Sequence, residues 1–185
     1  MIEDAAAWAE LQSLWPIKKF PLLRDGDKTV VESSVIVEYL TQRDPSTSRL
    51  IPEDLTSALN VRFLDRFFDN YVMTPMQKLV SDRMRDEPER DARGVGDARA
   101  TLDLAYAWLD KQIANPWGAG NTFTLADCAA APALFYADWV HPISDEFTRL
   151  RAYRSRLLAR PSIARVVNEA RPYRKYFPGG APARD

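Results

Sequence analysis

The chain has 185 residues, of which 46% are hydrophobic and 28% are charged, as expected for a globular protein with enough apolar side chains for a core. Its 25 basic and 26 acidic residues nearly cancel, so there is no basic excess to attract nucleic acid. One cysteine, Cys128, excludes an intrachain disulfide, and no apolar run approaches the roughly 18 residues of a membrane span, so we expect a cytoplasmic protein.

The first 44 residues read as helix, strand, strand and helix. Residues 5–15 hold good helix formers and end before Pro16. Asp25-Gly26 between two apolar runs predicts a hairpin with strands over residues 18–23 and 28–31. Ser33 or Ser34 is then expected to cap a helix. The apolar stripe expected on that helix consists of Val35, Ile36, Tyr39 and Leu40.

Residues 45–55 are polar and proline-containing, and predict a linker between a first domain, 1–44, and an all-helical domain, 56–178. Residues 179–185 are expected to form a flexible tail. Pro75 predicts a kink or break in a helix. The apolar stripe of that helix is expected at Leu59, Phe63, Phe67, Tyr71 and Val72.

Four further segments of the second domain have helical patterns. Residues 98–113 predict an amphipathic helix, and the nearly all-apolar residues 124–140 predict a central buried one. Residues 146–160 and 162–177 predict two more helices, separated by Pro161. The buried face expected for residues 98–113 consists of Leu102, Ala105, Leu109 and Ile113.

Phe20-Pro21 allows two interpretations. Proline cannot donate to a sheet ladder, so the plainer interpretation is an edge strand with a trans proline, since cis bonds are only about 5–6% of X-Pro bonds. The other is a functional one, in which the interrupted strand leaves the backbone N–H and C=O of Phe20 to pair with a peptide ligand.

Glu32-Ser33-Ser34 is either an ordinary helix cap or a binding site for an amino-acid head group. Unpaired N–H groups and the positive end of the helix dipole bind a carboxylate, and a serine hydroxyl adds a donor. Glu32 would accept from an ammonium group, and Lys18 and Lys19 would hold a second carboxylate.

Other chemical signals are weak. Thr124 and Asp127 have the spacing of a capping box, which is a structural feature. His141 is the one histidine, so a histidine triad or metal cluster is poorly supported and no metal is expected. Cys128 lies in an apolar segment and reads as a core residue rather than a nucleophile.

The order of these segments resembles the cytosolic glutathione transferase superfamily. Residues 19–23, KFPLL, are similar to the family's K-V-P-x-L segment, whose proline is cis, and DGD…VVESSVIVEYL resembles its glutathione-site hairpin and helix. FTLADCAAAPAL and YRSRLLARPSIARVV resemble two segments of the family's helical domain.

The resemblance implies a partial thioredoxin-like domain of α-β-β-α order, followed by an all-helical domain, commonly in a homodimer. It implies that glutathione is the co-substrate and that its thiol is transferred to a small electrophile. Ser33 would bind the γ-glutamyl carboxylate and Glu32 the amino end. Phe20, held by cis Pro21, would pair with the cysteinyl unit, and Lys19 would lie near the glycine end.

The chain departs from the family pattern at its start, because its first residues already resemble the second helix of the thioredoxin-like domain. The β-α-β segment that carries the thiol-activating residue has no counterpart, so the catalytic residue is unknown. Three interpretations follow: a chain that begins late in a complete transferase, a truncated binding protein without catalysis, or a protein-interaction module. We favour the first, because a sheet lacking two strands exposes backbone edges and apolar surface.

Overall fold

The computed structural model describes residues 4–44 and 49–185, which divide into two compact units, Met1–Ile51 and Pro52–Asp185. Residues 1–3 of the predicted first domain and residues 45–48 of the predicted linker lie outside the described residues. Each unit is described by itself.

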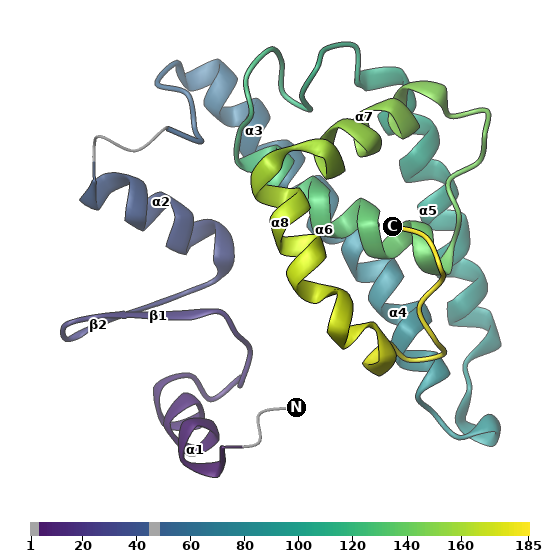
Figure 1. The fold of residues 1–185 in the computed structure, drawn as a ribbon, viewed down its shortest axis with the longest axis horizontal. Coiled ribbons are helices and arrows are strands. Elements are labelled where there is room, and N and C mark those ends of the chain that lie inside the picture. The colour runs from purple at the N-terminus through teal and green to yellow at the C-terminus, as the bar shows by residue number, and fades with distance from the viewer. Residues whose placement is uncertain (1–3, 45–48) are drawn as a thin grey trace. The chain divides into compact units, whose positions relative to one another are not determined.

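The first unit contains α1 (Ala5–Leu14), β1 (Leu22–Asp25), β2 (Lys28–Val31) and α2 (Ser33–Arg43), in the predicted order (Figure 1). The two strands pair antiparallel, with Leu22 opposite Val31 and Asp25 opposite Lys28. Gly26 begins the two-residue turn with a φ of 59°, a left-handed conformation that glycine adopts without steric cost. The hairpin predicted from Asp25-Gly26 is confirmed.

Three details of the first unit differ from the prediction. The first strand begins at Leu22 rather than residue 18, since Lys18 is left-handed (φ 60°) and Pro21 has no N–H to donate to the ladder. Glu32 is the N-cap residue of α2, and the serines follow inside the helix. Val35 and Leu40 are exposed, so the apolar stripe predicted for α2 is only partly turned inward.

Polar contacts connect the helices of the first unit to its hairpin. The hydroxyl of Tyr39 donates to Asp25 Oδ2 at 2.6 Å, and Arg43 Nε lies 3.1 Å from the same oxygen. The Tyr39 hydrogen bond and the charge of Arg43 lower the pKa of Asp25 below its ordinary value. Every described residue of this unit is exposed or half-buried, as expected for a two-stranded sheet.

The second unit is all-helical (Figure 1). Its long helices are α3 (Leu55–Phe67), α4 (Thr74–Arg83), α5 (Ala92–Gln112), α6 (Leu125–Val140), α7 (Thr148–Ala159) and α8 (Pro161–Ala170). Its shorter segments are a π-helix η1 (Phe68–Met73) and two 3₁₀ segments, η2 (Glu87–Glu89) and η3 (Arg171–Tyr176). Helix α6 packs against α3, η1, α4 and α7, which confirms the central buried helix predicted for residues 124–140.

Pro75 lies at the start of α4, directly after the π-helix η1. Thr74 N donates to Asp69 O, five residues back, and the Thr74 hydroxyl donates to the same carbonyl at 2.9 Å. This wider turn accommodates a residue that lacks an N–H, so the interruption predicted at Pro75 is confirmed.

The stripe predicted for the helix before Pro75 is partly wrong. Leu59 is exposed and Phe63 and Tyr71 are about half exposed, with 47% and 51% of their surfaces accessible. Phe67 and Val72 are buried. Leu59 and Phe63 lie in α3, where the buried residues include Ala58, Val61 and Leu64 instead. The π-helix that follows has a wider turn, so one regular spacing does not describe both α3 and η1.

Helix α5 begins at Ala92, six residues before the predicted start at residue 98. Asp91 caps it by accepting from Gly94 N at 2.8 Å, and Lys78 Nζ contacts the other carboxylate oxygen at 2.6 Å. This cap offsets the low helix propensity of Gly94 and Gly96. The predicted inward face is confirmed, because Leu102, Ala105, Leu109 and Ile113 are buried.

A capping box begins α6. Asp127 is fully buried, and its Oδ2 accepts from Thr124 N at 2.8 Å and from the Thr124 hydroxyl at 3.1 Å. Its Oδ1 accepts from Gly118 N at 2.8 Å and from the Tyr153 hydroxyl at 2.6 Å. One carboxylate thus connects the start of α6 to the preceding loop and to α7.

The final residues of the chain contact α6 and η3 of the second unit. Arg184 contacts Asp138, and the Asp185 carboxylate pairs with Arg171 and Arg174. The flexibility predicted for residues 179–185 stays a prediction.

Candidate functional site

The open end of the hairpin brings together the residues that the sequence singles out in the first unit. Leu22, which follows Phe20-Pro21, pairs with Val31, which precedes Glu32 and Ser33. The two motifs therefore leave the ladder at the same end of the hairpin, although they are separated by ten residues of the chain.

The Phe20–Pro21 peptide bond is cis, which confirms the conformation implied by the resemblance. Phe20 lies just outside the ladder, and 70% of its surface is exposed. Its backbone N–H and C=O are among the polar groups that a peptide can pair with by adding a strand.

The start of α2 has the features of an anion-binding helix terminus. Its first intrahelical bond runs from Ile36 N to Glu32 O at 2.9 Å, so the amides before Ile36 have no acceptor inside the helix. Within the described part of the chain, neither the Ser33 hydroxyl nor the Glu32 carboxylate has a hydrogen-bond partner. Both groups are available to a ligand, and the helix dipole favours a negative charge here.

Glu32 has φ 70° and ψ 121°, outside the region that non-glycine residues ordinarily occupy. Such a conformation costs about 1–3 kcal/mol and tends to occur at functional sites. It turns the chain from the end of β2 into the first turn of α2, and so presents the Ser33 amide at the open end of the hairpin. Lys19, the remaining predicted site residue, is exposed before the cis bond.

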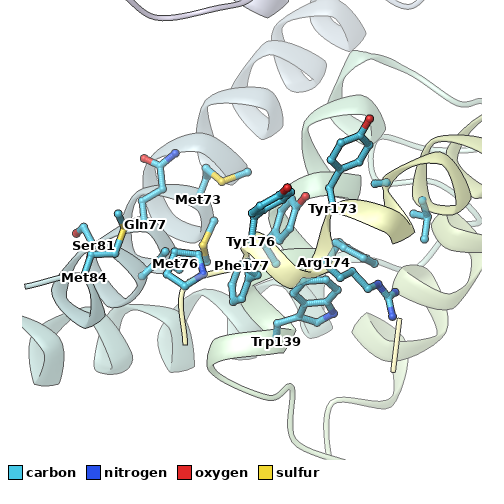
Figure 2. A pocket seen from close by; sticks show the side chains of 16 residues that line it. Met73, Met76, Gln77, Ser81, Met84, Trp139, Tyr173, Arg174, Tyr176 and Phe177 are labelled. Carbon is cyan, nitrogen blue, oxygen red and sulfur yellow. The ribbon is translucent and has the colours of Figure 1, made fainter. Parts of the chain in front are cut away.

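The second unit holds a cavity of about 590 Å³. Methionines from η1, α4 and its end lie on one side, and aromatic rings from α6 and the end of η3 lie on the other, as Figure 2 shows. The residues that shape it most are Met73, Met76, Met84, Phe135, Trp139, Tyr173, Tyr176 and Phe177. Methionine and aromatic side chains are polarisable and adapt to differently shaped apolar ligands, and this volume is that of a small-molecule site.

Sequence reasoning missed this cavity, because its two walls are between about 50 and 105 residues apart in the chain. Two signals were present: methionines at 73, 76 and 84, and a cluster of aromatic residues at 173–177. Neither is specific without the fold that brings α4 against α6 and η3.

Cys128 is half-buried in α6, and burial and the neighbouring Asp127 raise the pKa of its thiol to about 11. The thiol is therefore protonated at neutral pH, in agreement with its interpretation as a packing residue. Residues 4–44 and 49–185 contain no group of three or more His, Cys, Asp or Glu side chains that could hold a metal ion. Over the same residues, none of the helices combines the length and apolar character needed to cross a membrane.

Comparison with known protein families gives two matches. The family described as "Glutathione S-transferase, C-terminal domain" matches residues 63–156, and the one described as "Glutathione S-transferase, N-terminal domain" matches residues 2–48. The chain therefore belongs to the glutathione S-transferase family.

Among curated relatives, glutathione S-transferase U10 of Arabidopsis thaliana is 32% identical over 98 residues, 53% of this chain and 40% of the relative. A probable maleylacetoacetate isomerase of Vibrio cholerae is 26% identical over 171 residues, 89% of this chain and 78% of the relative. The chain thus spans less than half of the plant relative and about three quarters of the bacterial one.

Among solved structures, a glutathione S-transferase of Methylobacterium radiotolerans, crystallised in complex with glutathione sulfonate, superposes with a TM-score of 0.73 at 26% identity. The superposition covers 98% of this chain and 82% of that one. The predicted fold class is confirmed: elements of a thioredoxin-like domain followed by an all-helical domain of the transferase type.

Proposed function

We propose that the chain binds glutathione at the open end of the hairpin and acts as a transferase that joins its thiol to an electrophilic small molecule. The observation that carries this proposal is the left-handed Glu32, which begins α2 at the same end of the hairpin as the cis Phe20–Pro21 bond. Relatives whose names include glutathione S-transferase, and solved relatives crystallised with glutathione or its sulfonate, support it.

In this proposal each part of the tripeptide meets the chemistry it needs. The α-carboxylate of the γ-glutamyl unit accepts hydrogen bonds from the Ser33 amide and hydroxyl, and the Glu32 carboxylate accepts from its ammonium group. The cysteinyl backbone pairs with the N–H and C=O of Phe20, and Lys19 neutralises the glycyl carboxylate. The thiol must lose its proton before its sulfur bonds to the electrophile, and no described residue is assigned that role.

We assign the acceptor to the cavity between α4, α6 and η3. Its lining is mostly apolar, so it favours an aromatic or bulky apolar electrophile. The polar side chains that line it are Gln77, Ser81 and Arg174, together with the hydroxyl-bearing Tyr136, Tyr173 and Tyr176. A transferase acting on apolar electrophiles serves detoxification, and we place this one in the cytoplasm, where glutathione is abundant and a lone cysteine remains reduced.

Isothermal titration calorimetry with glutathione tests the binding half of the proposal. Ser33→Ala removes one donor to the carboxylate and leaves the helix amides, so we expect affinity on the order of ten-fold weaker. Ser13→Ala is the matched control, since Ser13 only donates to Glu10 O on α1. Equal affinities of the wild type and Ser33→Ala would reject the assignment of this site.

A dye-displacement assay with a neutral naphthalene compound tests the acceptor half. Met73→Lys puts a charge against the cavity, and we expect apolar affinity to fall about ten-fold with glutathione affinity unchanged. Asn70→Lys adds the same charge at an exposed position of η1 that does not line the cavity. If both variants behave alike, the cavity is not the acceptor site.

A homodimer is a further part of the proposal, supported by an aromatic cluster at the surface of α3, η1 and α5. Trp108 stacks on Phe67 with ring centroids 4.4 Å apart, while Phe63 and Tyr71 flank the pair and remain about half exposed. Exposed aromatic side chains of this kind are enriched at interfaces. Light scattering should show a dimer that Phe63→Glu dissociates, and a monomeric wild type would reject the dimer.

The competing function is a non-catalytic binding or interaction protein of the same fold. It predicts no turnover of a chloronitrobenzene electrophile in the presence of glutathione, together with co-purification of an unrelated protein. Turnover whose KM for glutathione rises about ten-fold with Ser33→Ala would exclude it.

A further inference from the structure

A cavity of about 420 Å³ lies between the end of α5 and α7, two helices that pack against each other in the second unit. The chain that follows α5, residues 113–116, forms one wall, and one face of α7 forms the other. Its charged residues are Arg149 and Arg156, and among the described residues no acidic side chain lines it. The lining therefore carries two positive charges and no negative one.

The four arginines of α7 divide between two faces of the helix. Arg151 and Arg154 each lie within ion-pair distance of an aspartate. In the part of the chain that the structure describes, neither Arg149 nor Arg156 has an ion-pair partner. These two are seven residues apart, so they lie on the same face of α7, separated by two turns or about 10.5 Å along the helix axis. The cavity thus has two spaced cations without counter-ions.

The surrounding contacts position these two side chains and leave most of their donors available. Arg156 Nη1 donates to Pro116 O at 2.7 Å, which holds one guanidinium against the chain after α5. Asp110, on α5, accepts at Oδ1 from the amides of Arg149 and Leu150, at 2.8 and 2.9 Å. Asp110 therefore caps the start of α7, and it does not line the cavity. Since a guanidinium has five N–H donors, both arginines retain donors for a ligand.

The rest of the lining is small or apolar, apart from one amide. Ala152 lies between the two arginines on the same face of α7, and Ile113 and Pro116 come from the other wall. The side chain of Asn115 has no hydrogen-bond partner in the described part of the chain and adds a polar group at the edge. This lining is complementary to a short hydrocarbon body that carries an anionic group at each end.

We propose that this cavity binds a small organic dicarboxylate, with one carboxylate on Arg149, the other on Arg156 and the hydrocarbon body over Ala152. A guanidinium matches the geometry of a carboxylate and binds it through two parallel hydrogen bonds. Because two helical turns separate the arginines, a ligand with two spaced carboxylates reaches both without drawing the guanidinium groups together. Both arginines are exposed, so added salt weakens the binding. The site lies in the helical unit and does not depend on the proposed glutathione site.

NMR titration of the isotope-labelled full chain with adipate tests this site, with hexanoate and hexanediol as separate arms of the same chain length. We expect adipate to shift the amides of Asn115 and of residues 149–156 saturably. Hexanoate lacks the second carboxylate and should bind on the order of ten-fold more weakly, and hexanediol should not bind. The absence of saturable adipate binding at millimolar concentrations, or equal affinities for adipate and hexanoate, would overturn the proposal.

Three variants locate the site. Arg149→Gln removes a guanidinium that makes no hydrogen bond or ion pair in the described chain, so adipate should bind this variant about as weakly as hexanoate binds the wild type. Ala152→Glu places a carboxylate three residues from Arg149 and four from Arg156, where it pairs with them and should abolish adipate binding. Arg151→Gln removes an arginine on the other face of α7 and is the matched control.

Urea denaturation of the same variants separates binding from folding. Opposite charges at these spacings stabilise a helix, so Ala152→Glu should be at least as stable as the wild type while it loses adipate. Unchanged adipate affinity in Arg149→Gln or Ala152→Glu, or an equal loss of affinity in Arg151→Gln, would overturn the proposal.

Discussion

Replacing Tyr153 with phenylalanine tests how far one buried carboxylate holds the helical unit together. The Tyr153 hydroxyl donates to Asp127 Oδ1 at 2.6 Å, and both side chains are fully buried. The substitution keeps the ring and its packing and removes only this donor. Asp127 retains its bonds from Gly118 and Thr124, so the expected loss is that of one hydrogen bond to a charged acceptor, about 1.5–3 kcal/mol.

Urea denaturation followed by circular dichroism measures this loss, and thermal unfolding should show a Tm lower by about 3–12 °C for a chain of this length. Tyr136→Phe is the matched control, because the hydroxyl of Tyr136 has no hydrogen-bond partner in the described part of the chain. A Tyr153→Phe variant within about 0.5 kcal/mol of the control would refute the reasoning.

Three further predictions concern local geometry. Gly94→Ala places a methyl group against the Asp91 carboxylate that caps α5, so we expect it to destabilise the chain. The methyl group of Gly96→Ala meets no other atom, so we expect this substitution to stabilise the chain by up to about 1 kcal/mol. Urea denaturation measures both changes. Tyr39→Phe removes a hydrogen bond to Asp25, so we expect the pKa of Asp25 to rise toward its ordinary value, as measured by NMR titration. An unchanged pKa of Asp25 would contradict this role of the hydrogen bond. Cys128, with its pKa of about 11, has ~100-fold less thiolate at pH 8 than an ordinary cysteine, so we expect iodoacetamide to alkylate it correspondingly slowly. An alkylation rate equal to that of free cysteine would contradict its burial.

In the first unit, the sequence predicted the hairpin but not the exact ends of its elements. Asp25-Gly26 predicted the hairpin correctly, because a two-residue turn of this type fixes the pairing of its flanks. The start of β1 was misplaced, since the left-handed backbone of Lys18 has no local signal. Serine was expected to cap α2, yet Glu32 occupies that position with an unusual backbone conformation that no propensity favours.

In the second unit, the helices were predicted correctly where the hydrophobic pattern of the sequence was strong and local. The nearly all-apolar α6 was placed correctly, whereas α5 began six residues earlier than expected, because the Asp91 cap offsets the low helix propensity of Gly94 and Gly96. The acceptor cavity lay beyond sequence reasoning for another reason. Met73 and Phe177 both line it, and helix packing brings them to one cavity although they are far apart in the chain.

The most direct test of glutathione binding is a titration of the isotope-labelled chain with glutathione, followed by NMR of the backbone amides. The proposal predicts saturable shifts that are largest at the amides of Phe20, Ser33 and Ser34, with smaller changes in the helical unit. Shifts confined to residues after Ile51, or no saturable shift, would contradict it.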